Sequence, residues 1–266
     1  MNSKSIKEII PARYSVRNYS GEPLSEEMIE KINSYIKNLK SPFNKEVRIQ
    51  LVKRNTDGES IKLGTYGVIK GADYFLISAC ENDDESLMAL GYALEEVILY
   101  CTSLGLGTVW LGGTFKKSDF AKAIDLKSDE ILPIVAPVGY GGGKKSLLGT
   151  LFGNHKNVRK PFSKLFFNGT FDTPLTESDA KEYFEPLEML RLAPSAVNKQ
   201  PWRAVKENNN INFYLVSTNN LNKVDIGIGL CHFHLTAIEN KLEGQFKVID
   251  DKKESAGFTY VISWVK

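Results

Sequence analysis

The sequence predicts an α+β protein built from two related halves. Helical and strand-like patterns alternate along the 266 residues, and a short motif near the start recurs in the second part of the chain. The Pro-Leu-Ser-Glu stretch at 23–26 matches the Pro-Leu-Thr-Glu stretch at 174–177, at an offset of 151 residues. A weaker match relates the regions around Gly91 and Gly229 in two long apolar helices. We therefore expect two diverged α+β halves, residues 1–150 and 151–266, fused in tandem.

The overall composition favours an ordinary globular protein of a reducing compartment. Apolar residues make up 42% of the chain, and the net charge of +2 favours neither nucleic acid nor an acidic membrane as a partner. Residues 1–10 lack the apolar segment of a secretory signal, and no apolar run reaches the roughly eighteen residues that span a membrane. Cys80, Cys101 and Cys231 are odd in number and have apolar neighbours, so we expect reduced core cysteines and a cytoplasmic location.

Periodicity defines the elements expected in the first half. A helix should run from an N-cap at Ser25 to Leu39, with acidic residues in its first turn. Residues 85–104 are apolar on most of a helical surface, so this helix should be central and buried. A shorter helix should begin with Ser118 as its cap and run to Ile124. The expected strands are Val47–Lys53, Tyr74–Cys80, Thr108–Leu111 and Ile131–Tyr140, with residues 56–70 and 141–145 as loops.

The second half shows a similar order of patterns after a basic stretch at 147–169. One helix is expected over 176–192, with a kink at Pro186, and another over 225–242. Three consecutive asparagines at 208–210 separate two strand patterns, which predicts a hairpin. The expected strands are Ala204–Lys206, Ile211–Ser217, Phe246–Ile249 and Tyr260–Val265.

The loop at 193–202 carries the densest group of recognition residues. Two prolines within it prevent a helix from continuing, so it should join the preceding helix to a strand. Ser195, Asn198 and Gln200 each offer hydrogen-bond donors and acceptors, which suits a flat polar heterocycle. A polar turn ending in a buried Trp202 explains the same residues about as well, so both interpretations stay open.

Arg13, Ser15 and Arg17 alternate near the start of the chain. On an extended segment these side chains point to one side, where two guanidinium groups and a hydroxyl face one dianion. The alternative is a solvated basic patch, because arginine is commonly exposed.

Both segments resemble signatures of the FMN-dependent nitroreductase family. Residues 195–202 are similar to its Ser-x-x-Asn-x-Gln-Pro-Trp motif, and residues 13–19 to its Arg-Arg-Ser-Val-Arg-x-Phe segment, with Tyr14 where Arg is usual. In the common family both motifs lie close together in one short subunit, and two subunits build each flavin site. Here 180 positions separate Ser15 from Ser195. The chain resembles a single-chain branch of the family, which implies a nitroreductase-like fold whose two halves form an internal pseudo-dimer.

The repeat leaves one good copy of each motif. At an offset of 151, the positions of Arg13, Ser15 and Arg17 correspond to Lys164, Phe166 and Asn168, so the second half lacks the phosphate motif. Conversely, residues 42–46 are a poor copy of residues 194–200. We therefore expect one composite FMN site per chain, between the halves, and an empty second position.

The resemblance also implies which residues bind the cofactor. Arg159, just before Lys160-Pro161, is similar to the family's basic residue after its last strand, and residues 105–110 resemble its Gly-Leu-Gly-x-x-Trp segment beside the flavin ring. No catalytic side chain is implied, because the cofactor carries the chemistry. The implied FMN-binding residues are Arg13, Tyr14, Ser15, Arg17, Trp110, Leu111, Gly112, Gly113, Arg159, Pro194, Ser195, Ala196, Asn198 and Gln200.

The implied function is that of an oxidoreductase. It would use NADH or NADPH to reduce a nitroaromatic, quinone or flavin-like acceptor through FMN, as a monomer or a weak homodimer. A flavin carrier or sensor without turnover is the alternative, and a cofactor-free structural relative is a third. Cys231, His232 and His234 suggest a metal cluster, but only Cys231 and His234 share a helical face, so we expect core residues and no metal.

Overall fold

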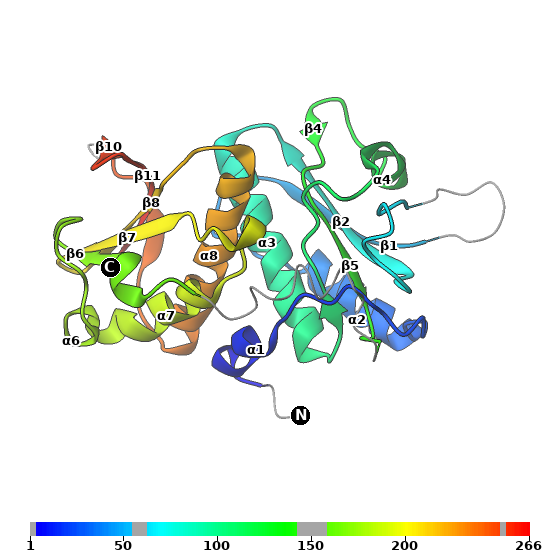
Figure 1. Ribbon diagram of the computed structural model, residues 1–266, viewed down its shortest axis with the longest axis horizontal. Coiled ribbons are helices and arrows are strands. Elements are labelled where there is room, and N and C mark those ends of the chain that lie inside the picture. Colours follow the sequence, from blue (N-terminus) through cyan, green and yellow to red (C-terminus); the bar gives the residue numbers. More distant parts are fainter. Residues whose placement is uncertain (1–3, 55–62, 143–158, 251–253) are drawn as a thin grey trace.

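The computed structural model describes residues 4–54, 63–142, 159–250 and 254–266. Two long helices lie at the centre, and a β-sheet stands on either side of them (Figure 1). One sheet is built from strands of the first part of the chain and the other from strands of the last part. The predicted mixture of helices and sheets is therefore confirmed. The basic stretch expected at 147–158 and parts of the loops at 56–70 and 141–145 lie outside the described residues.

The first sheet has the strand order β1-β2-β5-β3, and its described ladders are antiparallel. The strand predicted at 131–140 is divided into two short strands, one of which pairs with the end of β2. The strand predicted at 108–111 is shorter than expected and continues only as an isolated bridge between Leu111 and Val135. The strands are β1 (Val47–Lys53), β2 (Tyr74–Glu81), β3 (Gly107–Thr108), β4 (Glu130–Ile131) and β5 (Val135–Gly139).

The second sheet has the order β10-β11-β8-β7-β6, with β9 paired to β11. The predicted hairpin is confirmed, because β7 and β8 pair antiparallel from Trp202 opposite Leu215 to Glu207 opposite Asn210. The strands are β6 (Phe166–Asn168), β7 (Trp202–Glu207), β8 (Asn210–Leu215), β9 (Gln245–Lys247), β10 (Glu254–Ser255) and β11 (Phe258–Val265).

The central helices are α3 (Asp84–Ser103) and α8 (Asn220–Glu239). Both begin and end at an offset of 136 residues, and their N-caps, Asp83 and Asn219, share it. They cross closely at glycines, since a Cβ on Gly91 would lie 2.1 Å from the Val224 carbonyl oxygen and one on Gly227 would lie 2.0 Å from that of Met88. The two close approaches are related by the same offset of 136. Gly91 thus corresponds to Gly227 in this crossing, not to the predicted Gly229.

The remaining helices cover the ends of this core. The predicted helix at 176–192 is interrupted at Lys181, whose φ is +53°, so the break precedes Pro186, which lies in the first turn of α7. The short helix near 118 is capped at Lys116 and not at Ser118. Residues 6–12 form a helix that the sequence interpretation did not include. The outer helices are α1 (Ile6–Ala12), α2 (Glu26–Lys37), α4 (Lys117–Ala123), α6 (Glu177–Ala180) and α7 (Phe184–Leu192), with 3-10 turns at Phe162–Lys164, Lys181–Tyr183 and Ala196–Asn198.

Helix α1 docks on the last part of the chain, although it is the first element. The Ser5 hydroxyl donates to Glu239 at the end of α8 (2.7 Å), and the Ile6 amide donates to the same carboxylate (2.8 Å). Lys7 pairs with Glu185 of α7 at 3.1 Å. The segment that follows α1 begins with Arg13, which lies beside Glu95 of α3, and continues to Ser15, which bridges to Thr108 of β3. Among the described residues, no helix is both long and apolar enough to cross a bilayer.

Candidate functional site

The loop after α7 has a strained backbone. Val197, Asn198 and Gln200 all have positive φ values, of 45°, 58° and 50°. Non-glycine residues rarely adopt this conformation, and a β-branched valine adopts it least readily. Each such residue costs on the order of 1–2 kcal/mol and persists only where surrounding contacts fix it. The predicted helix-to-strand loop is confirmed, and its strained residues require contacts that fix them in place.

Contacts from within the loop and from α8 hold this shape. The backbone N–H of Gln200 donates to the Ser195 hydroxyl oxygen (2.9 Å), and the backbone N–H of Asn198 donates to the Ser195 carbonyl oxygen (2.9 Å). The Ala196 amide donates to both carboxylate oxygens of Asp225, at 3.0 and 3.1 Å. Burial raises the pKa of Asp225 to about 7, against the opposing effects of the Ala196 amide and Lys199. The loop therefore rests on a buried acid that titrates near neutral pH.

Arg159 and Lys160 hold the other side of the loop. The Arg159 guanidinium donates to the Asn198 side-chain oxygen and to the Leu192 carbonyl, the latter at 2.8 Å. The Lys160 amide donates to Gln200 Oε1 at 2.8 Å, and Gln200 Nε2 donates to Asn198 Oδ1 at 3.2 Å. Direct hydrogen bonds thus link Arg159 to Asn198, and Asn198 to Gln200, in the predicted loop, although Arg159 lies 39 residues before Asn198 in the sequence.

Arg13 lies at the C-terminal end of α1 and is almost completely buried. Its Nε and Nη1 atoms are buried and have no hydrogen-bond partner among the described residues, while Nε lies 3.7 Å from Glu95 Oε1. Burial lowers the pKa of Arg13, and the Glu95 charge opposes this effect. Burial, and then the positive charges of Arg13 and Arg191, lowers the pKa of Arg159 to about 10. The guanidinium groups of Arg13 and Arg159 therefore lie close enough to repel each other, and Arg13 Nε and Nη1 still need hydrogen-bond acceptors.

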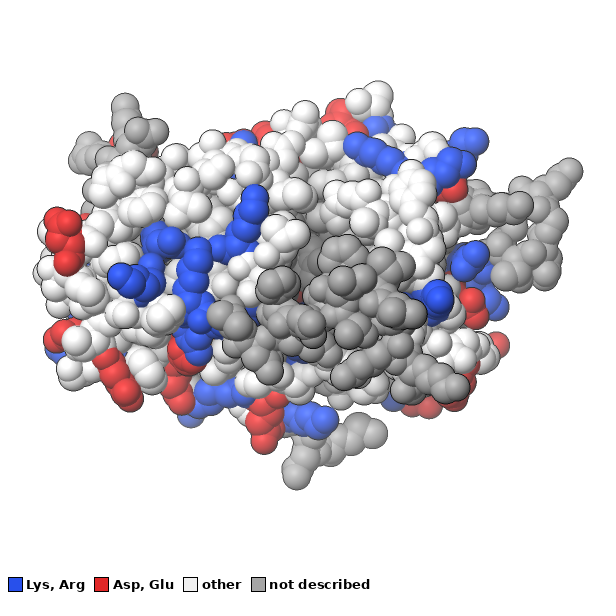
Figure 2. All heavy atoms as spheres, in the orientation of Figure 1, with Lys and Arg blue, Asp and Glu red and all other residues white. Residues whose placement is uncertain are grey.

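The surface near this convergence is basic. Figure 2 shows Lys and Arg side chains gathered on the face over α7 and β7. Burial, and then the charge of Arg203, lowers the pKa of Lys160. A local excess of positive charge attracts anions and raises their concentration at the site.

Glu95 of α3 connects Arg13 to two further residues. The carboxylate is fully buried and accepts a hydrogen bond from Trp110 Nε1 at 2.8 Å. The His232 ring, also fully buried, places Nε2 2.8 Å from Glu95 Oε1 and Nδ1 3.0 Å from the Met189 carbonyl. The sequence interpretation missed Glu95 and treated Asp225 only as the start of a helix. An acidic residue inside an otherwise apolar helical pattern was the signal present in both cases.

The segment at 110–113 forms one wall beside the start of α8. The Trp110 indole nitrogen is engaged by Glu95, and Leu111 exchanges backbone hydrogen bonds with Val135 at 2.9 and 3.1 Å. The backbone N–H of Leu111 is therefore already used. A Cβ on Gly112 would lie 3.1 Å from Leu221 of α8, one helical turn before Asp225, whereas one on Gly113 would meet nothing within 4 Å. Gly112 thus lies against the same part of α8 that supports Ala196, and Gly113 borders open space.

The remaining predicted residues are placed less centrally. Ser15 pairs with Thr108 in an isolated bridge, and the Val16 amide donates to the Thr108 carbonyl at 2.9 Å. Tyr14 is 56% exposed, and Arg17 is half-buried beside Tyr19. Four residues of extended chain span about 13 Å, so Arg13 and Arg17 are well separated along this segment. Pro194 is partly buried at the start of the strained loop.

The suspected metal-ligand residues point to other partners. His232 contacts Glu95, His234 Nδ1 lies 2.8 Å from the Tyr92 hydroxyl, and Cys231 is a buried free thiol. Within the described part of the chain, no group of three His, Cys, Asp or Glu residues is arranged to hold a metal ion.

Comparisons with known proteins agree with this architecture. A crystal structure of a nitroreductase from Thermotoga maritima has 22% identity and a TM-score of 0.62, and the match covers 100% of this chain and 95% of that one. A nitroreductase family protein of Clostridium difficile has 17% identity and a TM-score of 0.45, covering 60% of this chain and 95% of its own. A Desulfitobacterium hafniense nitroreductase with bound FMN has 18% identity and a TM-score of 0.41, covering 53% and 92%. No curated protein matches the sequence.

The family model described as "Putative TM nitroreductase" matches residues 5–237. This range includes both motif segments, the central helices and the strained loop. The predicted resemblance is therefore confirmed: the chain belongs to this nitroreductase family.

Proposed function

We propose that this chain is an FMN-dependent oxidoreductase that uses NADH or NADPH to reduce a small-molecule acceptor such as a nitroaromatic, a quinone or a flavin. The observation that carries the proposal is the convergence of the buried Arg13 guanidinium and the partly buried Arg159 guanidinium beside a strained polar loop. The bound FMN of the Desulfitobacterium hafniense nitroreductase supports the choice of cofactor. When bound, FMN would supply the electron-transfer chemistry, so no side-chain nucleophile is required.

The residues present fit the phosphate of such a cofactor. Like charges are costly to bury together unless an anion compensates them, and the Glu95 carboxylate lies 3.7 Å from Arg13 Nε while it also accepts a hydrogen bond from Trp110. A phosphate would accept hydrogen bonds from the buried Arg13 nitrogen atoms. Arg159, which is held by Asn198 and the Leu192 carbonyl, would be a second guanidinium donor to the same phosphate. Ser15, Arg17 and Tyr14 complete the proposed phosphate end.

The polar loop and the glycine segment fit the ring. The Ser195–Gln200 loop contacts the start of α8 through Asp225, and Gly112 lies against Leu221 of the same helix, with Gly113 open beside it. We place the flavin ring against this surface, with the Gly112 and Gly113 backbone at its reactive edge, because the Leu111 amide is already paired. Pro194, Ala196 and Asn198 would border the ring, while Gln200, whose side chain is bonded to Lys160 and Asn198, would hold the loop in shape. Trp110 would lie near this end of the site, where its indole nitrogen donates to Glu95.

We further propose that residues 1–150 and 151–266 are the two halves of an internal pseudo-dimer that shares one site. Support comes from the common offset of α3 and α8 and from their reciprocal glycine contacts. Arg13 comes from one half, and Arg159 and the strained loop from the other, so the chain alone can complete the site. A monomer or a weak homodimer is consistent with that arrangement.

The test is an anaerobic reduction. Protein reconstituted with FMN is mixed with NADH or NADPH in the absence of oxygen, and the visible flavin absorption is followed. Bleaching within seconds, and its reversal by a nitroaromatic or quinone, is the expected result. A flavin band that persists for hours with both nucleotides would favour a carrier or sensor, and a protein that takes up no FMN would overturn the proposal.

A further inference from the structure

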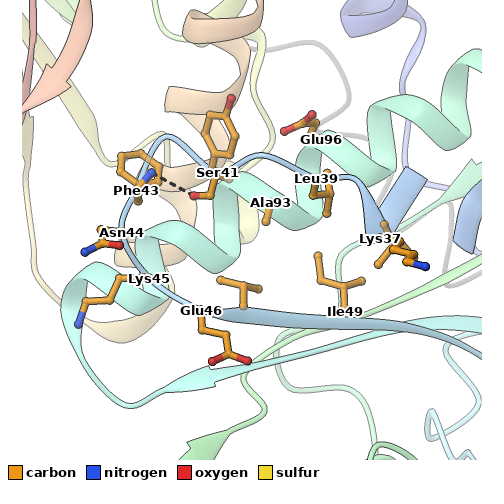
Figure 3. Close-up of a pocket in the computed structure, with 13 residues that line it drawn as sticks. Lys37, Leu39, Ser41, Phe43, Asn44, Lys45, Glu46, Ile49, Ala93 and Glu96 are labelled. Atoms are coloured by element: carbon orange, nitrogen blue, oxygen red, sulfur yellow. Dashed lines mark hydrogen bonds between the residues drawn. The ribbon is translucent and has the colours of Figure 1, made fainter. Parts of the chain in front are cut away.

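A cavity lies in the first half of the chain, between the end of α2, the loop at 39–46, the start of β1 and the middle of α3. Its volume of about 550 Å³ lies within the range of about 300–1,000 Å³ that is typical of small-molecule sites. Figure 3 shows Leu39, Ala93 and Ile49 around the hollow, with Glu96 reaching in from α3. None of these residues belongs to the proposed flavin site.

The second half of the chain fills the corresponding space with an indole. By the offset that relates α3 to α8, Ala93 corresponds to Gly229. A Cβ on Gly229 would lie 3.5 Å from the six-membered ring of Trp202, which is fully buried and begins β7. Val47 begins β1 and lines the cavity. Trp202 and Val47 each begin the strand that follows the loop of their half, and valine is much smaller than tryptophan. The cavity therefore lies beside Ala93, where the second half has an indole beside Gly229.

The polar chemistry of the cavity comes chiefly from Glu96. The Tyr35 hydroxyl donates to Glu96 Oε1 at 3.1 Å, and burial raises the pKa of this carboxyl against the effect of that hydrogen bond. A partly buried carboxylate next to apolar side chains is stabilised by a cation more than by any neutral group.

The other polar residues of the lining are engaged or exposed. The Tyr92 hydroxyl is bound to His234, whose pKa burial lowers to about 4, so this ring carries no charge at neutral pH. Lys45 pairs with Asp83 at 3.2 Å and has two further carboxylates at 3.9 Å. Lys37 and Glu46 are exposed.

We propose that this cavity binds a small aromatic amine, with its ring in the space equivalent to that of Trp202 and its ammonium group on Glu96. The aliphatic and aromatic residues within a mixed lining, such as Leu39 and Phe43, would contact the ring, and the Glu96 carboxylate favours a cation over a neutral or anionic tail. The site is independent of the flavin, so its occupation and FMN binding can be measured separately in the same preparation.

The test uses three indoles that differ only in the tail: tryptamine, tryptophol and indole-3-propionate. Titration calorimetry with the full-length protein is expected to show that tryptamine binds about tenfold or more tightly than tryptophol, with indole-3-propionate the weakest. Glu96→Gln should abolish the preference for tryptamine, while the matched control Glu30→Gln, at an exposed acid of α2 outside the cavity lining, should leave it unchanged. Equal affinities for the three compounds, or no binding of tryptamine, would overturn the proposal.

A second variant tests the location without touching the carboxylate. Val47→Trp places an indole at a residue that lines the cavity and should remove tryptamine binding while FMN binding is retained. If this variant binds both FMN and tryptamine as the wild type does, the amine does not occupy the cavity.

Discussion

Two loops pack on the two central helices, and they differ in content more than in position. The 195–200 loop rests on α8 through Asp225, and Arg159 and Lys160 hold it from outside. The 42–46 loop rests on α3, where Phe43 lies against Tyr92 and Phe246 with ring centroids 5.5 Å apart in both pairs. The position on α3 that corresponds to Asp225 is Ala89. A similar frame thus supports a polar network on one side and aromatic packing on the other.

The same contrast holds at the phosphate end. Arg13 is buried with donor atoms unsatisfied among the described residues, whereas Phe166, at the position equivalent to Ser15 by the offset of 151, is a fully buried strand residue of β6. Phe166 packs against Phe162 with ring centroids 4.6 Å apart. Aromatic rings cannot replace hydrogen-bond donors to a dianion. The comparison teaches that two similar helix pairs and sheets can carry loops and terminal segments of very different polarity.

The strongest consequence of this comparison is stoichiometric. We expect one FMN per chain, because one side has the polar loop and the cations and the other has Phe43, Phe246 and Phe166 in their place. Titration of the flavin-free protein, together with the molar mass in solution, measures the ratio. A ratio near two, or a site that forms only when two chains associate, would contradict the composite single site.

Asp225→Asn tests the support of the polar loop. The pKa of Asp225 is about 7 in the folded protein and 3.8 in its ordinary state. Between these pH values the folded protein binds one more proton than the unfolded chain does, so stability falls as pH rises from about 4 to about 7. The shift corresponds to about 4 kcal/mol at most. Asp225→Asn has no titrating group at this position and should lose this pH dependence. Compared with the wild type, its free energy of unfolding should therefore be higher at pH 8 than at pH 4.

Urea unfolding without added flavin at both pH values measures this effect, and Asp84→Asn, an exposed acid of α3, is the matched control. A difference between the wild type and Asp225→Asn that does not change with pH would show that Asp225 is ionised in the folded protein throughout.

Arg159→Ala tests the phosphate end. A desolvated, charge-assisted contact contributes roughly 1.5–3 kcal/mol, so the FMN dissociation constant should rise about tenfold to a hundredfold or more. Riboflavin, which lacks the phosphate, should lose much less affinity, and Lys45→Ala, in the corresponding loop of the other half, should change neither. Equal losses for FMN and riboflavin would indicate that Arg159 only shapes the loop.

The sequence predicted the main strands and the long helices well because the spacing of apolar residues determines them. Strand β1 was predicted with its observed bounds, and the predicted 85–104 helix differs from α3 by one residue at each end. The break before α7 was wrongly assigned to Pro186, because proline is tolerated in a first helical turn and Lys181 adopts a conformation that no sequence rule favours. Helix α1 was missed because it is only seven residues long and depends on a capping box and on contacts with α7 and α8.

The site was predicted only in part, for a related reason. Motif spacing identified Arg13, Arg159 and the 195–200 loop, and the structure places them together. Glu95 and Asp225 escaped notice because their roles arise from the crossing of α3 and α8, which local sequence does not encode. Gln200 was expected to face a ligand, yet its side chain is buried between Lys160 and Asn198.

The smallest expected effect separates the two interpretations of Asn198. Its φ of 58° favours Asn or Gly, so Asn198→Ala should cost about 1 kcal/mol of stability that Asn198→Gly largely avoids. Both variants remove the oxygen that accepts from Arg159 and Gln200. If Asn198 borders the flavin, both should shift the visible spectrum and reduction potential of bound FMN by similar amounts. If only Asn198→Ala has an effect, and only on stability, the residue serves the turn and not the cofactor.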